Sequence, residues 1–145
     1  MTAEPRDTAT VRVTRAFDAP AERVFDAWLD PSLAGRFLFA TDTGEMVRAE
    51  IDARVGGRFV LTDRRDGEDV EHVGEYAEID RPRRLVFDFA VPRYSPTRTR
   101  MTLDLVPRGD GCEATLTHEG VPPDQAERGR HGWTHILDAL ARALG

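Results

Sequence analysis

The sequence predicts an α+β fold in which a curved antiparallel sheet of about seven strands wraps around one long C-terminal helix. Residues 11–17 alternate apolar and polar side chains with period two, and further segments of this kind follow between positions 46 and 118. The last segment instead repeats apolar side chains every three and four residues, which is typical of an amphipathic helix. Short turns favour antiparallel neighbours, and a long helix can cover the concave face of such a sheet.

Two short helices are predicted directly after the first strand. Asp18 is the expected N-cap of the first helix, whose apolar stripe includes Trp28. Asp30 precedes Pro31 and is expected to cap a second short helix that runs through Phe37.

The alternation returns at Met46 and continues through the rest of the predicted sheet. The second strand is expected to carry one apolar face made of Val47, Ala49, Ile51, Ala53 and Val55. Gly56-Gly57 then forms a turn. Further strands are predicted from residue 59 and over residues 70–79, 84–91, 98–106 and 112–118. The final helix follows Pro122-Pro123 and spans about two dozen positions or slightly fewer.

The length of 145 residues fits one domain with one core. Residues 1–10 carry Pro5 and no periodicity, so we expect a flexible leader there and a single domain over residues 11–145. The leader lacks the basic-then-apolar order of a signal peptide, and no apolar run approaches the roughly 18 residues of a membrane-spanning helix. A cytoplasmic protein without a membrane span is therefore expected.

The charged residues exclude several kinds of function. A net charge of -6 argues against sequence-independent binding of nucleic acid, which needs a basic face. All 20 basic residues are arginine, and asparagine is absent too, which is typical of GC-rich coding and indicates a bacterial source. Without lysine, neither Schiff-base catalysis nor a Walker phosphate loop is available. We predict no cofactor.

Several segments of the chain resemble one known family when they are taken together. They are residues 17–28 (FDAPAERVFDAW), 55–59 (VGGRF), 74–87 (GEYAEIDRPRRLVF), 116–122 (LTHEGVP) and 131–133 (HGW). This pattern resembles START-like domains, also called the SRPBCC superfamily, in the branch similar to the C-terminal domain of the activator of heat-shock-protein-90 ATPase. The resemblance runs from about residue 11 to residue 144. It implies a helix-grip fold with an internal cavity for a hydrophobic or amphipathic small molecule.

Aromatic side chains are the main candidates for the wall of this cavity. Many relatives carry a paired tryptophan after the second helix, where this chain reads RFLF at residues 36–39, so the mouth of the cavity should differ. The candidate cavity residues are Trp28, Phe37, Phe39, Phe59, Tyr76, Phe87, Phe89, Met101, His118, Trp133 and Leu137. For each of them the alternative is an ordinary place in the core. Tyr76 and Trp133 are favoured as cavity residues because each has a polar tip.

Residues able to carry out chemistry are few. His118 shares a strand face with Leu116 and could act as acid, base or hydrogen-bond donor, although a structural histidine bonded to a backbone carbonyl is the alternative. Tyr76 is the other weak catalytic candidate. The only serines lie outside any GxSxG motif, and the single cysteine, Cys112, has no activating neighbour in the sequence.

Two further patterns concern charged and metal-binding side chains. Arg15 shares the inward face of the first strand, so we expect a carboxylate partner such as Glu75 or Glu119, or a ligand anion. Glu127, His131 and His135 follow each other at four-residue steps, which can chelate a metal. Because this stripe lies opposite Trp133, we interpret it as a solvated face and predict no metal site.

Three functions remain open at this point. The first is a non-enzymatic protein that binds a small apolar molecule, which the lack of a catalytic set favours. The second is a cyclase or dehydratase that uses Tyr76 and His118 in the same cavity. The third is a module resembling a co-chaperone, which would stimulate a heat-shock-protein ATPase through its surface. A homodimer is also expected, as is common among small bacterial domains.

Overall fold

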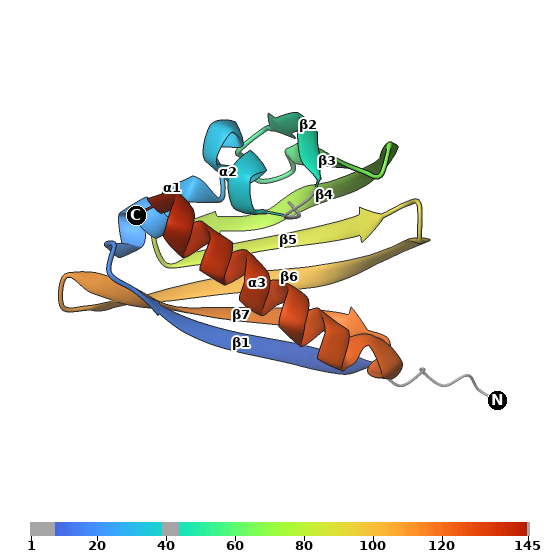
Figure 1. The fold of residues 1–145 in the computed structure, drawn as a ribbon. Helices are drawn as coiled ribbons and strands as arrows, with labels where there is room; N and C mark the ends of the chain where they lie inside the picture. The colour runs from blue at the N-terminus through green and yellow to red at the C-terminus, as the bar shows by residue number, and fades with distance from the viewer. Residues whose placement is uncertain (1–7, 39–43, 145) are drawn as a thin grey trace.

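The computed structural model of the protein describes residues 8–38 and 44–144. Strands and helices follow one another in the order that the sequence predicts (Figure 1). The elements are β1 (Ala9–Phe17), α1 (Ala21–Ala27), α2 (Pro31–Phe37), β2 (Glu45–Ile51), β3 (Arg58–Arg65), β4 (Glu68–Asp80), β5 (Arg84–Val91), β6 (Ser95–Arg108), β7 (Gly111–Val121), a 3₁₀ turn (Pro123–Gln125) and α3 (Ala126–Leu144). The expected leader ended at residue 10, whereas β1 begins at Ala9 and pairs with Val121 there.

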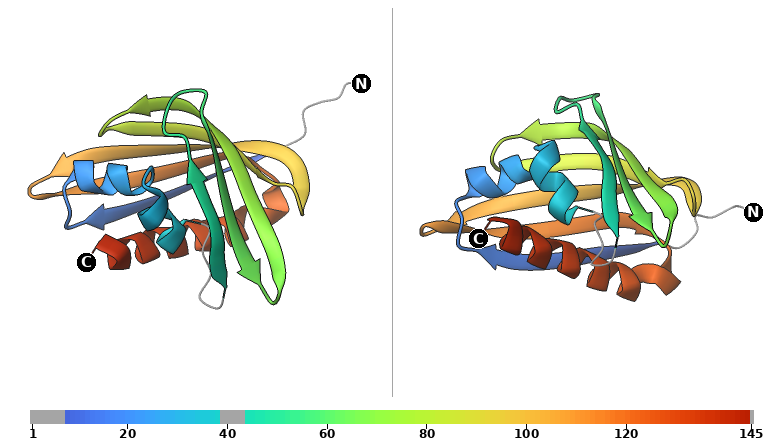
Figure 2. Two further views of the ribbon diagram at one scale, coloured as in Figure 1. Left: turned by 90° about the horizontal axis from the view of Figure 1, so that it is seen from above. Right: turned by 45° about the horizontal axis from the view of Figure 1, so that its top comes forward.

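One seven-stranded antiparallel sheet holds all the strands, in the order β1-β7-β6-β5-β4-β3-β2. The sheet is strongly curved, because β2–β4 run at a steep angle to β1 and β7 (Figure 2). Helix α3 crosses its concave side, while α1 and α2 lie near the C-terminal end of α3 (Figures 1 and 2). The predicted fold class is therefore confirmed.

Helix α3 lies on the sheet through one apolar stripe. The helix has 19 residues and buries the side chains of Trp133, Ile136, Leu137, Leu140 and Leu144. Their spacing of three and four residues places them on one side, as the sequence predicts. Burial of each large aliphatic side chain contributes about 1.5–3 kcal/mol, so packing rather than helix propensity holds α3 in place.

The two short helices confirm one predicted cap and correct the other. The carboxylate of Asp30 accepts a hydrogen bond from the backbone N–H of Ser32 at 3.0 Å, with Pro31 in the first turn of α2. The predicted cap by Asp18 is wrong. Helix α1 begins only at Ala21, and Pro20 occupies its N-cap position without a side-chain hydrogen bond. Asp18 therefore lies too far before the first turn to cap it.

Strand β2 departs from the expected alternation. A β-bulge between Met46 and Arg48 shifts its register against β3, and Val47 is 38% exposed. The strand ends at Ile51, and Val55 lies in the following turn with 60% of its surface exposed. An extra residue in a strand reverses the side that residues on either part of it face, so Val47 is wrongly placed in the predicted apolar face. Ala49 and Ile51 do share an inward face and pack against the core, as predicted.

The outer face of the sheet is occupied by arginine–carboxylate pairs between neighbouring strands. The guanidinium of Arg100 lies 2.9 Å from the Asp88 carboxylate, and that of Arg64 lies 2.8 Å from the Asp69 carboxylate. Exposed pairs of this kind contribute about 0–1 kcal/mol each, so they mark the water-facing side more than they stabilise it. No helix in the described residues is long and apolar enough to cross a membrane.

Candidate functional site

Most of the aromatic side chains predicted to line a cavity lie in the hydrophobic core. Phe59, Tyr76 and Phe87 form one cluster, with ring centroids 5.1–6.2 Å apart. Trp28 packs edge-on against Phe37 at 5.2 Å. The core also contains the predicted cavity residues Met101 and Leu137, both fully buried. Phe39 lies outside the described residues.

A groove opens between α3 and the inner face of the sheet, at the end of the molecule where α3 begins. It consists of two adjoining hollows of about 370 and 380 Å³, whose walls share Phe89, Val91, His118, Val121 and Gln125. Trp133 and Ile136 close it on the helix side. We call this the α3 groove. Of the predicted cavity residues, it brings together Phe89, His118 and Trp133.

His118 is held in the groove wall by two hydrogen bonds. The indole Nε1–H of Trp133 donates to Nδ1 of His118 at 3.0 Å. Nε2 of His118 lies 2.7 Å from Oγ1 of Thr99 on β6. The expected alternative, a bond to a backbone carbonyl, is replaced by these side-chain partners. Thr99 was not among the predicted site residues.

Aromatic packing keeps His118 neutral. The ring of Phe89 stacks on the imidazole with centroids 5.2 Å apart, and Trp133 meets both rings edge-on. Burial among these rings lowers the pKa of His118 to about 4, because the charged imidazolium loses its hydration there. At pH 7 the groove therefore presents a neutral imidazole.

A second buried histidine, His72, also lines the groove and was missed from the sequence. Its Nδ1 lies 3.3 Å from the carbonyl oxygen of Leu61, and its side chain is only 5% exposed. Burial, and then the positive charge of Arg65, lower its pKa to about 4. Alternation along β4 places His72 on the same inward face as Tyr76, which was the available signal.

Tyr76 and His118 do not share one pocket. Tyr76 is 3% exposed between Phe59 and Phe87, and burial followed by the charge of Asp52 raises the pKa of its hydroxyl. The α3 groove does not include it in its wall. Phe87 and Phe89 connect the two side chains through ring contacts, with Phe89 next to His118. The pair is therefore not placed to act on one bound molecule.

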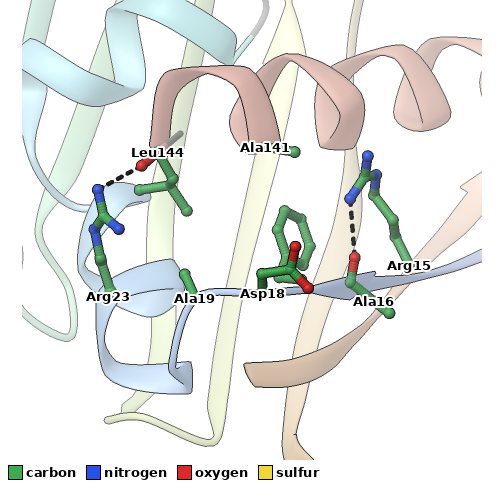
Figure 3. A pocket seen from close by; sticks show the side chains of 8 residues that line it. Arg15, Ala16, Asp18, Ala19, Arg23, Ala141 and Leu144 are labelled. Atoms are coloured by element: carbon green, nitrogen blue, oxygen red, sulfur yellow. Dashed lines mark hydrogen bonds between the residues drawn. The ribbon is translucent and has the colours of Figure 1, made fainter. Parts of the chain in front are cut away.

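Another hollow, of about 320 Å³, lies beside the C-terminal end of α3 (Figure 3). Arg23 donates to the carbonyl oxygen of Leu144, the last described residue of the helix (Figure 3). Arg15 donates to the carboxylate of Asp138 at 2.8 Å and to the carbonyl oxygen of Ala16 at 2.9 Å. The expected partners Glu75 and Glu119 are wrong, because α3 lies across β1 and brings Asp138 to Arg15. Both guanidinium groups therefore hold elements of the fold together through these hydrogen bonds.

Metal and thiol chemistry find little support in the described residues. No three His, Cys, Asp or Glu side chains among them group closely enough to hold a metal ion. His131 lies 3.8 Å from the Glu127 carboxylate on an exposed turn of α3. Cys112 is buried, and burial raises the pKa of its thiol, so it is a poor nucleophile at neutral pH.

Comparison with known families gives one match that covers most of the chain. The family model described as Activator of Hsp90 ATPase homolog 1-like protein matches residues 18–145. This match supports the predicted resemblance to the START-like superfamily. No curated protein matches the chain.

Solved bacterial structures share the fold along almost the whole chain. A protein from Chromobacterium violaceum is 28% identical with a TM-score of 0.83, over 92% of this chain and 94% of that one. The AHSA1-like protein from Aeromonas hydrophila is 20% identical with a TM-score of 0.82, over 94% and 92% of the two chains. A protein from Staphylococcus aureus is 15% identical with a TM-score of 0.84, over 94% and 93%.

Proposed function

Because the chain belongs to the Activator of Hsp90 ATPase homolog 1-like family, we propose that it uses the START-like fold to bind a small hydrophobic or amphipathic molecule in the α3 groove. The mainly apolar wall of the groove, at the volume of a small-molecule site, carries the proposal. Hollows of about 370 and 380 Å³ fall within the roughly 300–1,000 Å³ of small-molecule sites. Their walls are mainly apolar, with a few polar groups that can orient a ligand. The proposal includes the cytoplasmic location expected from the sequence.

Gly132 of α3 supports this proposal. Gly132 lies in the groove wall, and a Cβ added there would meet no atom within 4 Å. A glycine inside a helix costs about 0.5–1 kcal/mol relative to alanine. Since no neighbour requires the missing side chain, packing does not explain this cost. An open groove does explain it, because any larger residue would project into the space that a ligand needs.

Filling the groove from the helix side is expected to weaken ligand binding strongly. Gly132→Leu should weaken the binding of propylbenzene about tenfold or more, because the new side chain occupies the ligand volume. Binding is measured by NMR titration, following the indole N–H signal of Trp133. Thr134→Leu on the solvent side of the same helix is the matched control and should bind like the wild type. Equal affinity in all three proteins would contradict the proposal.

The natural ligand can be identified directly from the protein's own host. Native mass spectrometry of protein purified from that host is expected to show one apolar molecule bound per chain, which extraction then identifies. Gly132→Leu produced in the same host is expected to carry none. Wild-type protein that emerges empty and also fails to bind propylbenzene would overturn the proposal.

The two other functions have weaker support. A cyclase that relied on Tyr76 and His118 would need both groups at one ligand, and only His118 reaches the groove. The family name suggests contact with a heat-shock-protein chaperone as another function. However, the large exposed hydrophobic side chains in the described residues lie on separate segments, namely Val47, Val55, Tyr94 and Val106. We therefore place ligand binding before a surface interaction.

A further inference from the structure

The hydrogen-bond chain in the groove wall has a fixed direction. An indole nitrogen can only donate, so Nδ1 of His118 must accept from Trp133 and carries no proton. A neutral imidazole then holds its single proton on Nε2. Nε2 therefore donates to Oγ1 of Thr99 across 2.7 Å. The opposite direction would require an imidazole without any proton.

This direction leaves the hydroxyl proton of Thr99 available. Within residues 8–38 and 44–144, the only hydrogen bond formed by this hydroxyl is the one that it accepts from His118. Thr99 lines the groove beside Phe89 and Val91. Its neighbour across the strands is Gly120, which has no side chain to cover it. An O–H donor thus lies in a mainly apolar wall.

We propose that the α3 groove selects molecules that join an apolar body to a hydrogen-bond acceptor oxygen, such as the carbonyl of a ketone or ester, which Thr99 binds. This inference rests on the proposed function and names the class of ligand. Trp133 and His118 are positioning residues, because they orient the hydroxyl and do not themselves bond the acceptor. A purely apolar molecule fills the same space but leaves the Thr99 donor without a partner.

A pair of probes with one carbon skeleton tests the inference. Propiophenone and propylbenzene differ only in a carbonyl that replaces one methylene. Thr99→Val is expected to weaken the binding of propiophenone about fivefold, which is the typical effect of one neutral hydrogen bond. The affinity for propylbenzene should change by less than about twofold. Thr99→Ser keeps the hydroxyl and should restore the affinity for propiophenone. Thr102→Val lies on the same strand outside the groove and is the matched control.

The outcomes separate the two proposals. If Thr99→Val changes the affinity for both probes equally, or for neither, the inference is overturned while binding in the groove stands. If neither probe shifts the Trp133 indole signal in the wild type, the proposed function itself fails. Long-range ¹⁵N NMR of the imidazole gives an independent result. A proton on Nδ1 of His118 would reverse the hydrogen-bond chain and remove the donor, which also overturns the inference.

Discussion

Lowering the pH from 7 to 4 is expected to reduce the free energy of unfolding by about 2–3 kcal/mol for each of the two buried histidines, His72 and His118. Both have a pKa of about 4 in the folded protein, against 6.5 for an unperturbed histidine. Between these two values the unfolded chain binds more protons than the folded one. The stabilising effect of the neutral histidines is therefore complete above about pH 6.5 and is lost as the pH falls towards 4.

Two carboxylates that are paired with arginine lose their contribution to stability mainly below this window. Asp26 and Asp69 have a lowered pKa, chiefly because each accepts hydrogen bonds from an arginine. Their contribution is present above the ordinary carboxyl pKa and is lost only as the pH falls below it. Around His72, the charge of Arg65 lowers its pKa and that of Asp63 raises it, but burial is the largest cause.

Urea unfolding followed by tryptophan fluorescence at several pH values measures this effect. His72→Gln and His118→Gln should each remove about half of the loss between pH 6.5 and 4, because glutamine keeps hydrogen-bonding groups but does not titrate there. The double variant should be almost independent of pH in that window. An unchanged loss in the double variant would show that other groups cause it.

The elements of the fold were predictable because they depend on periodicity within the chain. The alternation in β1 and the three- and four-residue spacing of Trp133, Leu137 and Leu140 each describe a single face of one element. The order of these elements left few arrangements that cover every apolar face. The prediction was wrong where one extra residue in β2 turned Val47 outward, since a bulge leaves no clear mark in the pattern.

The candidate site was less predictable because it depends on contacts between distant parts of the chain. His118 and Trp133 were identified, but their bond to each other and to Thr99 depends on how α3 crosses β6 and β7. The same packing paired Arg15 with Asp138, which lies 123 positions away. A pattern that reveals only inward faces cannot distinguish a core residue such as Tyr76 from a groove residue such as Phe89.

A second large effect is expected where β4 passes beneath the core aromatic cluster. Gly74 has no side chain, and the ring of Phe59 lies directly on it. A Cβ added to Gly74 would lie 2.3 Å from Cε2 of Phe59 and 2.5 Å from the backbone carbonyl oxygen of Asp88. Phe59 is 2% exposed against Tyr76 and Phe87, so its ring has nowhere to move. Gly74→Ala should therefore destabilise the protein by about 3 kcal/mol.

Gly132→Ala is the matched control for this substitution. The same added methyl group meets no atom within 4 Å there, so removing a helical glycine should stabilise the protein by about 0.5–1 kcal/mol. Phe59→Leu should recover part of the loss in the Gly74→Ala background, which makes the two substitutions non-additive. The clash with the carbonyl oxygen of Asp88 stays in that double variant, so the recovery should be incomplete. If Gly74→Ala were as stable as the wild type in urea, Phe59 would not be held against β4. The aromatic core beside the α3 groove could then rearrange to accept the added methyl group.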